Sequence, residues 1–171
     1  MSTQTAKVNG VSLAYEDHGT GDRPLVLVHG FTGSRDDFRE HMPALAGIGR
    51  TIAYDHRGHG DSTNTGNAST YTFEQLADDL CAFLDALGIA RCDLLGHSMG
   101  GMVVLRFALR HPERVASLLL MDTSARAPDN MPRAAFAAGG SIARSDGMAT
   151  LAQLLRARAS DDQLLCGAGV Q

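Results

Sequence analysis

The sequence has few of the residues on which nucleic-acid binding depends. It contains no tryptophan, only 5% aromatic residues and a formal net charge of −4. Lys7 is the only lysine, and the arginines are scattered rather than grouped. Because nothing resembles a basic patch for phosphates or an aromatic platform for stacked bases, we expect no nucleic-acid partner.

The chain also lacks the patterns of a disulfide framework and of a metal centre. Its three cysteines, Cys81, Cys92 and Cys166, are an odd number at unrelated spacings. Disulfide frameworks and structural metal sites use paired or regularly spaced ligands instead. We therefore expect reduced, structural thiols, with no metal and no other cofactor.

Long apolar segments are missing too. Residues 1–5 show no apolar signal-peptide centre, and no stretch has the roughly 20 apolar residues needed to span a bilayer. These absences predict a soluble, cytoplasmic protein without membrane contact.

What the chain does contain is an alternation of short apolar runs and amphipathic segments. Apolar residues make up 44% of its 171 residues, enough for one sizeable core. The turn signal Asn9-Gly10 indicates an opening hairpin, and Ser34 with Asp37 indicates a capping box before a helix. Further strands are expected at residues 24–28, 50–54, 91–95 and 115–121, and further helices at 72–87, 99–110 and 148–158. This order predicts an α/β fold with a mostly parallel sheet and flanking helices.

One motif, Gly96-His97-Ser98-Met99-Gly100, has the G-x-S-x-G spacing of a nucleophile elbow. The spacing places a serine on a sharp turn, where side chains at the flanking glycines would collide with the backbone. An expected strand precedes the motif and an expected helix follows it. We therefore interpret Ser98 as a nucleophile, and the amide of Met99 as a donor to an oxyanion on the substrate.

A second motif, His29-Gly30-Phe31, directly follows the apolar strand at residues 24–28. In this architecture the loop after that strand supplies the other oxyanion-hole amide. The main chain of Phe31 is the candidate donor, and a simple strand-ending turn is the alternative.

These two motifs, together with DHRGHGDS at residues 55–62, resemble the α/β-hydrolase superfamily over residues 7–125. The resemblance lies with the group of esterases, 3-oxoadipate enol-lactonases, C–C hydrolases and cofactor-free haloperoxidases. It implies the N-terminal part of an α/β-hydrolase core at residues 1–125 and a partial helical cap at residues 126–171.

The resemblance also implies a reaction. Ser98 would attack a small carboxylic ester or lactone and form an acyl-enzyme, with the amides of Phe31 and Met99 holding the oxyanion. Serine rather than aspartate at position 98 argues against epoxide hydrolase and haloalkane dehalogenase activity, since those relatives use a carboxylate nucleophile. C–C hydrolysis, perhydrolysis and a non-catalytic ligand-binding role remain the alternatives.

The sequence departs from the family in its triad. The expected order is serine, acid, histidine, but the only histidine after Ser98 is His111, roughly 20 Å further along the same helix. His29 is the one conceivable surrogate base. Asp122, after the last expected strand, is a candidate acid, and a turn-capping aspartate is the alternative. We therefore expect an N-terminal portion of the fold with weak or no activity of its own.

This arrangement has a structural consequence at residues 115–121. A sheet that ends there would leave an unpaired, apolar strand at its edge, and such edges promote pairing with another chain. The first interpretation is that the sequence is a part of a longer family member in which further strands cover this edge. Self-association through the edge is the alternative.

Overall fold

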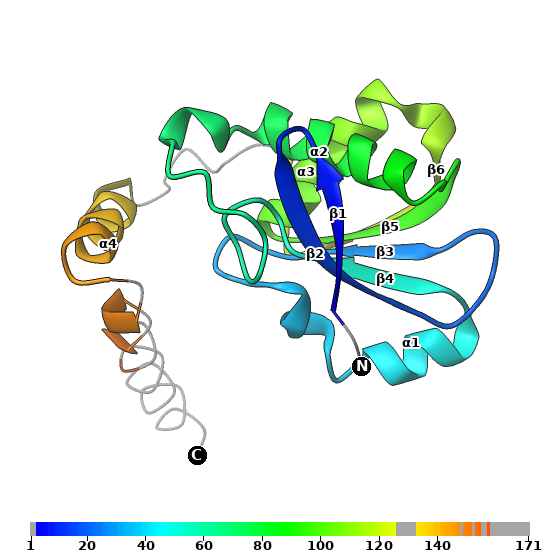
Figure 1. Ribbon diagram of the computed structural model, residues 1–171, viewed down its shortest axis with the longest axis horizontal. Helices are drawn as coiled ribbons and strands as arrows, with labels where there is room; N and C mark the ends of the chain where they lie inside the picture. Colours follow the sequence, from blue (N-terminus) through cyan, green and yellow to red (C-terminus); the bar gives the residue numbers. More distant parts are fainter. Residues whose placement is uncertain (1–2, 126–132, 148, 152, 155–156, 158–171) are drawn as a thin grey trace, which may run out of the picture. The chain divides into compact units, whose positions relative to one another are not determined.

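The computed structural model of the protein describes residues 3–125, 133–147, 149–151, 153–154 and 157 (Figure 1). The chain separates into two compact units, Met1–Arg126 and Ala127–Gln171. The strands of the first unit are β1 (Gln4–Val8), β2 (Val11–His18), β3 (Leu25–Val28), β4 (Thr51–Tyr54), β5 (Cys92–His97) and β6 (Val115–Met121). Its α-helices are α1 (Met42–Ile48), α2 (Phe73–Ala86) and α3 (Met99–Arg110), with short 3-10 turns at Arg35–Phe38, Ala68–Thr70 and Pro112–Arg114.

Within the described residues the strands form one sheet in the order β1-β2-β4-β3-β5-β6. The hairpin of β1 and β2 pairs antiparallel to β4, whereas β4, β3, β5 and β6 are all parallel. The predicted α/β fold with a mostly parallel sheet is confirmed. Parallel strands end at one edge of the sheet, so the loops that follow β3, β4, β5 and β6 meet there.

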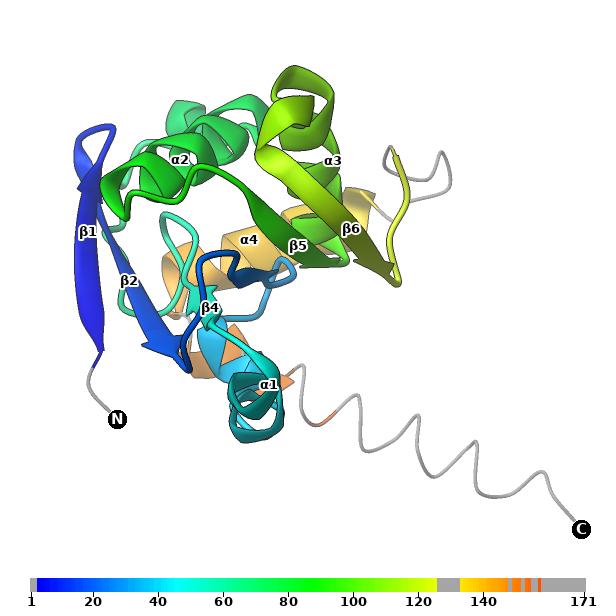
Figure 2. The same cartoon turned by 90° about the vertical axis from the view of Figure 1, so that its right-hand side faces the viewer.

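Helices cover both faces of this sheet. Helices α2 and α3 lie on one face and α1 lies on the other (Figure 2). The side chains of β3 alternate accordingly: Val26 and Val28 join the larger core with α2 and α3, and Leu27 joins a smaller core with Met42 of α1. Burial on both faces explains why β3 is an unbroken apolar run.

The predicted hairpin turn is present and is tied to α2. Asn9 and Gly10 both have positive φ, 45° and 79°, as a type I′ turn requires. The Asn9 side chain also donates to Asp79 of α2 at 2.9 Å. At the start of α2, the hydroxyl of Thr72 accepts from the amide of Gln75 at 3.1 Å, as a capping residue does.

The helix predicted after Ser34 is not continuous, so that part of the prediction is wrong. The chain forms a 3-10 turn at Arg35–Phe38 and a separate helix α1 from Met42. Pro43 explains the break, because proline lacks an N–H and its ring collides with the preceding turn of a continuous helix. The Ser34 hydroxyl accepts from Asp36 N–H at 3.2 Å, so the expected pairing with Asp37 is replaced by a shorter cap.

The second unit contains helix α4 (Arg133–Ser145), and residues 149–151, 153–154 and 157 are helical as well. The helix predicted at 148–158 therefore falls partly outside the described residues. The assignment of residues 126–171 to a cap stays a prediction. Among the described residues, no helix has the length and apolar character required to cross a membrane.

The edge strand β6 is apolar and unusually exposed. Leu119, Leu120 and Met121 are 45–46% exposed. The strand VASLLLM carries no charge and no proline, the two features that commonly protect an edge from pairing. Its outer backbone groups therefore offer a surface for another strand.

We expect the chain to self-associate through β6, and the variant Leu119→Lys to weaken that association by roughly tenfold or more, since a lysine on an edge strand opposes pairing. Sedimentation velocity over a range of concentrations measures the effect. Leu109→Lys is the matched control, because Leu109 is 83% exposed but lies on α3. A wild-type chain that stays monomeric throughout the range contradicts the prediction.

Candidate active site

Ser98 lies at the junction of β5 and α3 and is partly exposed. Its backbone angles, φ 50° and ψ −116°, cost a residue other than glycine roughly 1–3 kcal/mol. Two hydrogen bonds hold this conformation: Ser98 N–H donates to the carbonyl of Met121 at 2.9 Å, and the Thr123 hydroxyl donates to the carbonyl of Ser98 at 2.7 Å. The sharp turn predicted from the motif is therefore present, and β6 helps to maintain it.

The side chain of Ser98 is not consumed in capping α3, even though Ser98 is the residue before the helix. Met99 is the first residue of α3, so its amide belongs to the first turn and has no carbonyl four residues back within the helix to accept from it. The serine hydroxyl and these amides thus occupy one end of α3, where the helix dipole favours negative charge.

The glycines of the motif allow close packing rather than an unusual backbone angle. A Cβ added at Gly96 would lie 2.6 Å from the Cα of Gly101, and one at Gly100 would lie 2.6 Å from the carbonyl oxygen of His29. Real Cβ atoms do not approach backbone atoms so closely. Glycine at both positions is therefore what allows α3 to lie against the ends of β3 and β5.

The loop after β3 reaches the elbow. A Cβ at Gly30 would lie 3.3 Å from Cβ of Ser98 and 3.2 Å from Nδ1 of His97. The structure thus brings Gly30, and with it the start of the His29-Gly30-Phe31 motif, directly against the serine. Phe31 itself is 55% exposed.

His29 is fully buried and its two ring nitrogens have different roles. Nε2 accepts the backbone N–H of His56 at 3.0 Å, and Nδ1 contacts the carbonyl of Gly30 at 2.7 Å. Only the neutral tautomer with its proton on Nδ1 satisfies both partners. Burial lowers the pKa of His29 to about 4, against the opposing effect of the hydrogen bond to Gly30. Both nitrogens are occupied, so this geometry does not suit His29 to the role of surrogate base.

The bond from His29 also orients the peptide that joins Gly30 to Phe31. The Gly30 carbonyl accepts from Nδ1 of His29 and from the Gly33 N–H at 3.1 Å. In a trans peptide the N–H points away from the carbonyl. Because the hydrogen bond from His29 orients the Gly30 carbonyl, it also orients the Phe31 N–H on the opposite side of the same peptide.

Asp122 directly follows β6 at the same edge of the sheet. It is exposed and has φ 44°, in the left-handed region that aspartate tolerates better than most residues. Its neighbour Met121 accepts the Ser98 amide, so Asp122 lies one residue from a direct contact of the elbow. The position suits a triad acid and a turn aspartate equally, and both predictions stand.

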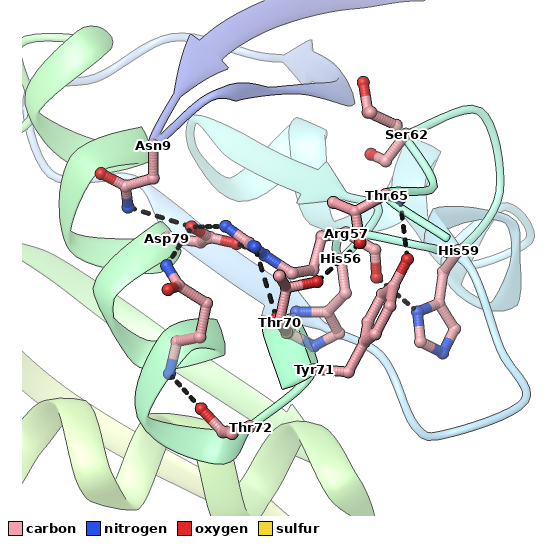
Figure 3. Close-up of polar contacts among 12 residues, drawn as sticks. Asn9, His56, Arg57, His59, Ser62, Thr65, Thr70, Tyr71, Thr72 and Asp79 are labelled. Atoms are coloured by element: carbon pink, nitrogen blue, oxygen red, sulfur yellow. Dashed lines mark hydrogen bonds and ion pairs between the residues drawn. The ribbon is translucent and has the colours of Figure 1, made fainter. Parts of the chain in front are cut away.

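Two buried ion pairs hold the long loop between β4 and α2. Arg57 donates to Asp79 through Nε at 2.5 Å and Nη2 at 2.7 Å, and Asn9 and Gln75 also donate to the same carboxylate (Figure 3). Removing one partner of such a pair leaves an uncompensated buried charge and costs about 3–5 kcal/mol.

The second ion pair joins Arg35 to Asp55, which also accepts the Asp61 N–H at 3.0 Å. Neither pair was foreseen from the sequence. The available signal was Asp79 itself, a charge within the apolar stripe of α2 formed by Leu76, Leu80 and Phe83.

The described cysteines are structural in character. Cys92 is buried in β5, Cys81 is partly buried in α2, and both are free thiols. Burial raises the pKa of the Cys92 thiol to about 12, so it remains protonated. Within the part of the chain that the structure describes, no group of three or more His, Cys, Asp and Glu side chains converges as a metal site would require.

Comparison with known proteins identifies the class to which this fold and site belong. Residues 23–156 match the family described as "alpha/beta hydrolase fold". The chain belongs to that family, as its motifs and its mostly parallel sheet indicated.

Individual relatives differ in what their names state. The dihydrolipoyllysine-residue acetyltransferase component of the acetoin cleaving system of Pseudomonas putida is 44% identical over 69% of this chain and 32% of its own length. Bifunctional epoxide hydrolase 2 of Mus musculus is 37% identical over 70% of this chain and 22% of its own length.

A solved structure shares the fold at similar identity. It is a bacterial membrane phospholipase A, 32% identical with a TM-score of 0.70, covering 75% of this chain and 42% of that protein. The chain thus spans less than half the length of each of these three relatives.

The close approach of α3 to β3 gives the first prediction for this site. We expect Gly100→Ala to lower the free energy of unfolding by about 1–3 kcal/mol, because the added methyl meets backbone carbonyls that cannot rotate away. Urea denaturation measures this. The control is Gly47→Ala in α1, where a Cβ meets nothing within 4 Å. Equal stability of the two variants would show that the packing at Gly100 is less tight than described.

The second prediction for this site comes from the buried histidines His29 and His56. Burial lowers the pKa of His29 to about 4 and, together with repulsion from His29 and His59, lowers that of His56. The unfolded chain therefore binds more protons than the folded one below about pH 6.5, and stability falls as the pH drops from there toward 4. For His29 alone the loss reaches roughly 2 kcal/mol at about pH 5.

Urea denaturation at several pH values checks the direction and the source of this effect. His29→Asn should make the pH dependence shallower between pH 7 and pH 5, while His41→Gln, which changes an exposed histidine, should not alter it. A wild-type chain whose stability is constant or rises on acidification in that window rejects the assignment.

Proposed function

We propose that the protein is a serine hydrolase of small carboxylic esters or lactones, with Ser98 as its nucleophile. The observation that carries this proposal is the strained backbone of Ser98, held between β5 and α3 with Gly30 packed against it. Strained conformations persist only where the surrounding structure over-determines them, and they cluster at functional sites. Membership of the α/β-hydrolase family and the likeness to a phospholipase A support ester chemistry.

In this proposal the Ser98 oxygen attacks the substrate carbonyl, and the carbonyl oxygen becomes an oxyanion. The amides of Phe31 and Met99 would donate hydrogen bonds to that oxyanion. Removing one such donor typically costs about 2.7–4 kcal/mol of transition-state stabilisation. The fixed peptide between Gly30 and Phe31 supports this role, since a preorganised donor needs no rearrangement during the reaction.

The serine also needs a base to accept its proton. His29 is hydrogen-bonded at both nitrogens, and His111 lies beyond the far end of α3, so neither fits that role. Asp122 at the end of β6 is our candidate for the acid that would orient such a base. We expect the 171-residue chain to react slowly, at the residual level that an oxyanion hole alone can sustain.

The nature of residue 98 weighs against the activity named for the mouse relative. The resemblance to epoxide hydrolases extends over the fold, but the residue at the elbow here is a hydroxyl nucleophile, which suits acyl transfer. C–C hydrolysis and perhydrolysis use the same serine and remain the alternatives. Turnover of a p-nitrophenyl ester compared with a β-diketone discriminates between ester and C–C hydrolysis.

The direct test is labelling with a fluorophosphonate probe followed by peptide mass spectrometry. We expect one slow modification per chain, on the peptide that contains Ser98, and none in Ser98→Ala. Ser145→Ala, which removes a hydroxyl in α4, is the control and should label like the wild type. Persistent labelling of Ser98→Ala would refute the nucleophile, and a wild-type chain that binds ester analogues without reacting would favour the non-catalytic alternative.

A further inference from the structure

His59 connects two loops that meet at the edge of the sheet near Ser98. It belongs to the loop between β4 and α2, where its backbone N–H donates to the carbonyl of His56 at 3.0 Å. Its Nδ1 lies 3.1 Å from the carbonyl of Arg57 in the same loop (Figure 3). Its Nε2 lies 2.5 Å from the carbonyl oxygen of Phe31, in the loop after β3.

The two contacts are chemically informative because both partners are carbonyl oxygens, which only accept hydrogen bonds. A neutral imidazole has one N–H and one lone pair, so it can donate to only one of them. The contact with Phe31 is shorter by 0.6 Å, from 3.1 to 2.5 Å. For the neutral ring, the geometry therefore places the proton on Nε2, with Phe31 as its acceptor.

This contact completes the restraint on the main chain of Phe31. The peptide on its N-terminal side is held by His29, which contacts the Gly30 carbonyl at 2.7 Å. The peptide on its C-terminal side is held by His59. Hydrogen bonds on both neighbouring peptides therefore restrain the direction of the Phe31 N–H.

We propose that His59 is a positioning residue of the oxyanion hole, acting by donating its Nε2–H to the carbonyl of Phe31. This inference rests on the proposed function, since it requires the Phe31 amide to bind the developing oxyanion. A purely structural role, joining two loops at any contact point, is the competing explanation. The two explanations differ in which nitrogen of His59 matters.

Two substitutions separate the nitrogens. The amide nitrogen of glutamine in His59→Gln can reach the position of Nε2 and keep the donor to Phe31. The shorter side chain of His59→Asn reaches only the position of Nδ1 and loses that donor. We expect fluorophosphonate labelling of Ser98 to be about tenfold slower in His59→Asn and within about twofold of wild type in His59→Gln. Thermal unfolding of both variants shows whether they are equally folded.

Labelling that is equally fast in all three proteins overturns the role of His59 while leaving Ser98 as the nucleophile. Equal slowing in both variants also overturns it, since the Nε2 donor would then not be the cause. If the wild type does not label at all, the proposed function fails, and NMR then tests the contact between His59 and Phe31 independently. Nitrogen NMR of ring-labelled histidine should then show a protonated Nε2 on His59 near pH 7, and an unprotonated Nε2 rejects the inference.

Discussion

The close approach of α3 to the ends of β3 and β5 is the constraint on which the rest of the site depends. A Cβ added at Gly100, in the first turn of α3, would lie 2.6 Å from the carbonyl oxygen of His29. A Cβ added at Gly96 would lie 2.6 Å from the Cα of Gly101. A side chain at either position would move the helix outward. The position of Ser98 beside Gly30 rests on this packing, so the chemistry that we propose requires glycine at both positions.

Hydrogen bonds to the backbone then fix the loops that this packing brings together. The neutral ring of His29 links the loop after β3 to the loop after β4, by accepting from His56 and donating to Gly30. Ion pairs also hold the loop after β4. In one of them, Arg57 donates two hydrogen bonds to the carboxylate of Asp79 in α2. Burying these charges is expensive, and each remains favourable only while its partners are in place. The loops are thus defined by a few specific bonds rather than by apolar contact.

The sequence predicted the elements whose signal is local. The period of apolar residues located β3 and α2, and the glycine spacing around Ser98 located the elbow with its flanking strand and helix. It failed where a single residue interrupts a pattern, as Pro43 does in the helix expected after Ser34. It also failed where the partner is distant along the chain: the pairing of Asp79 with Arg57 and the contact of His59 with Phe31 join segments 22 and 28 residues apart. No periodicity encodes such pairs.

The exposed edge of the sheet and the elbow are parts of one arrangement. Ser98 donates its N–H to Met121 at the end of β6 and accepts from Thr123 just beyond it, so an edge strand of the sheet maintains the strain. A strained conformation persists only while its surroundings over-determine it. A strand that paired with the outer side of β6 would therefore also restrain Ser98. By thermodynamic linkage, a ligand that requires the strained serine must in turn favour that pairing. If Ser98 is the nucleophile that we propose, its reactivity and strand pairing at this edge would be coupled through two hydrogen bonds.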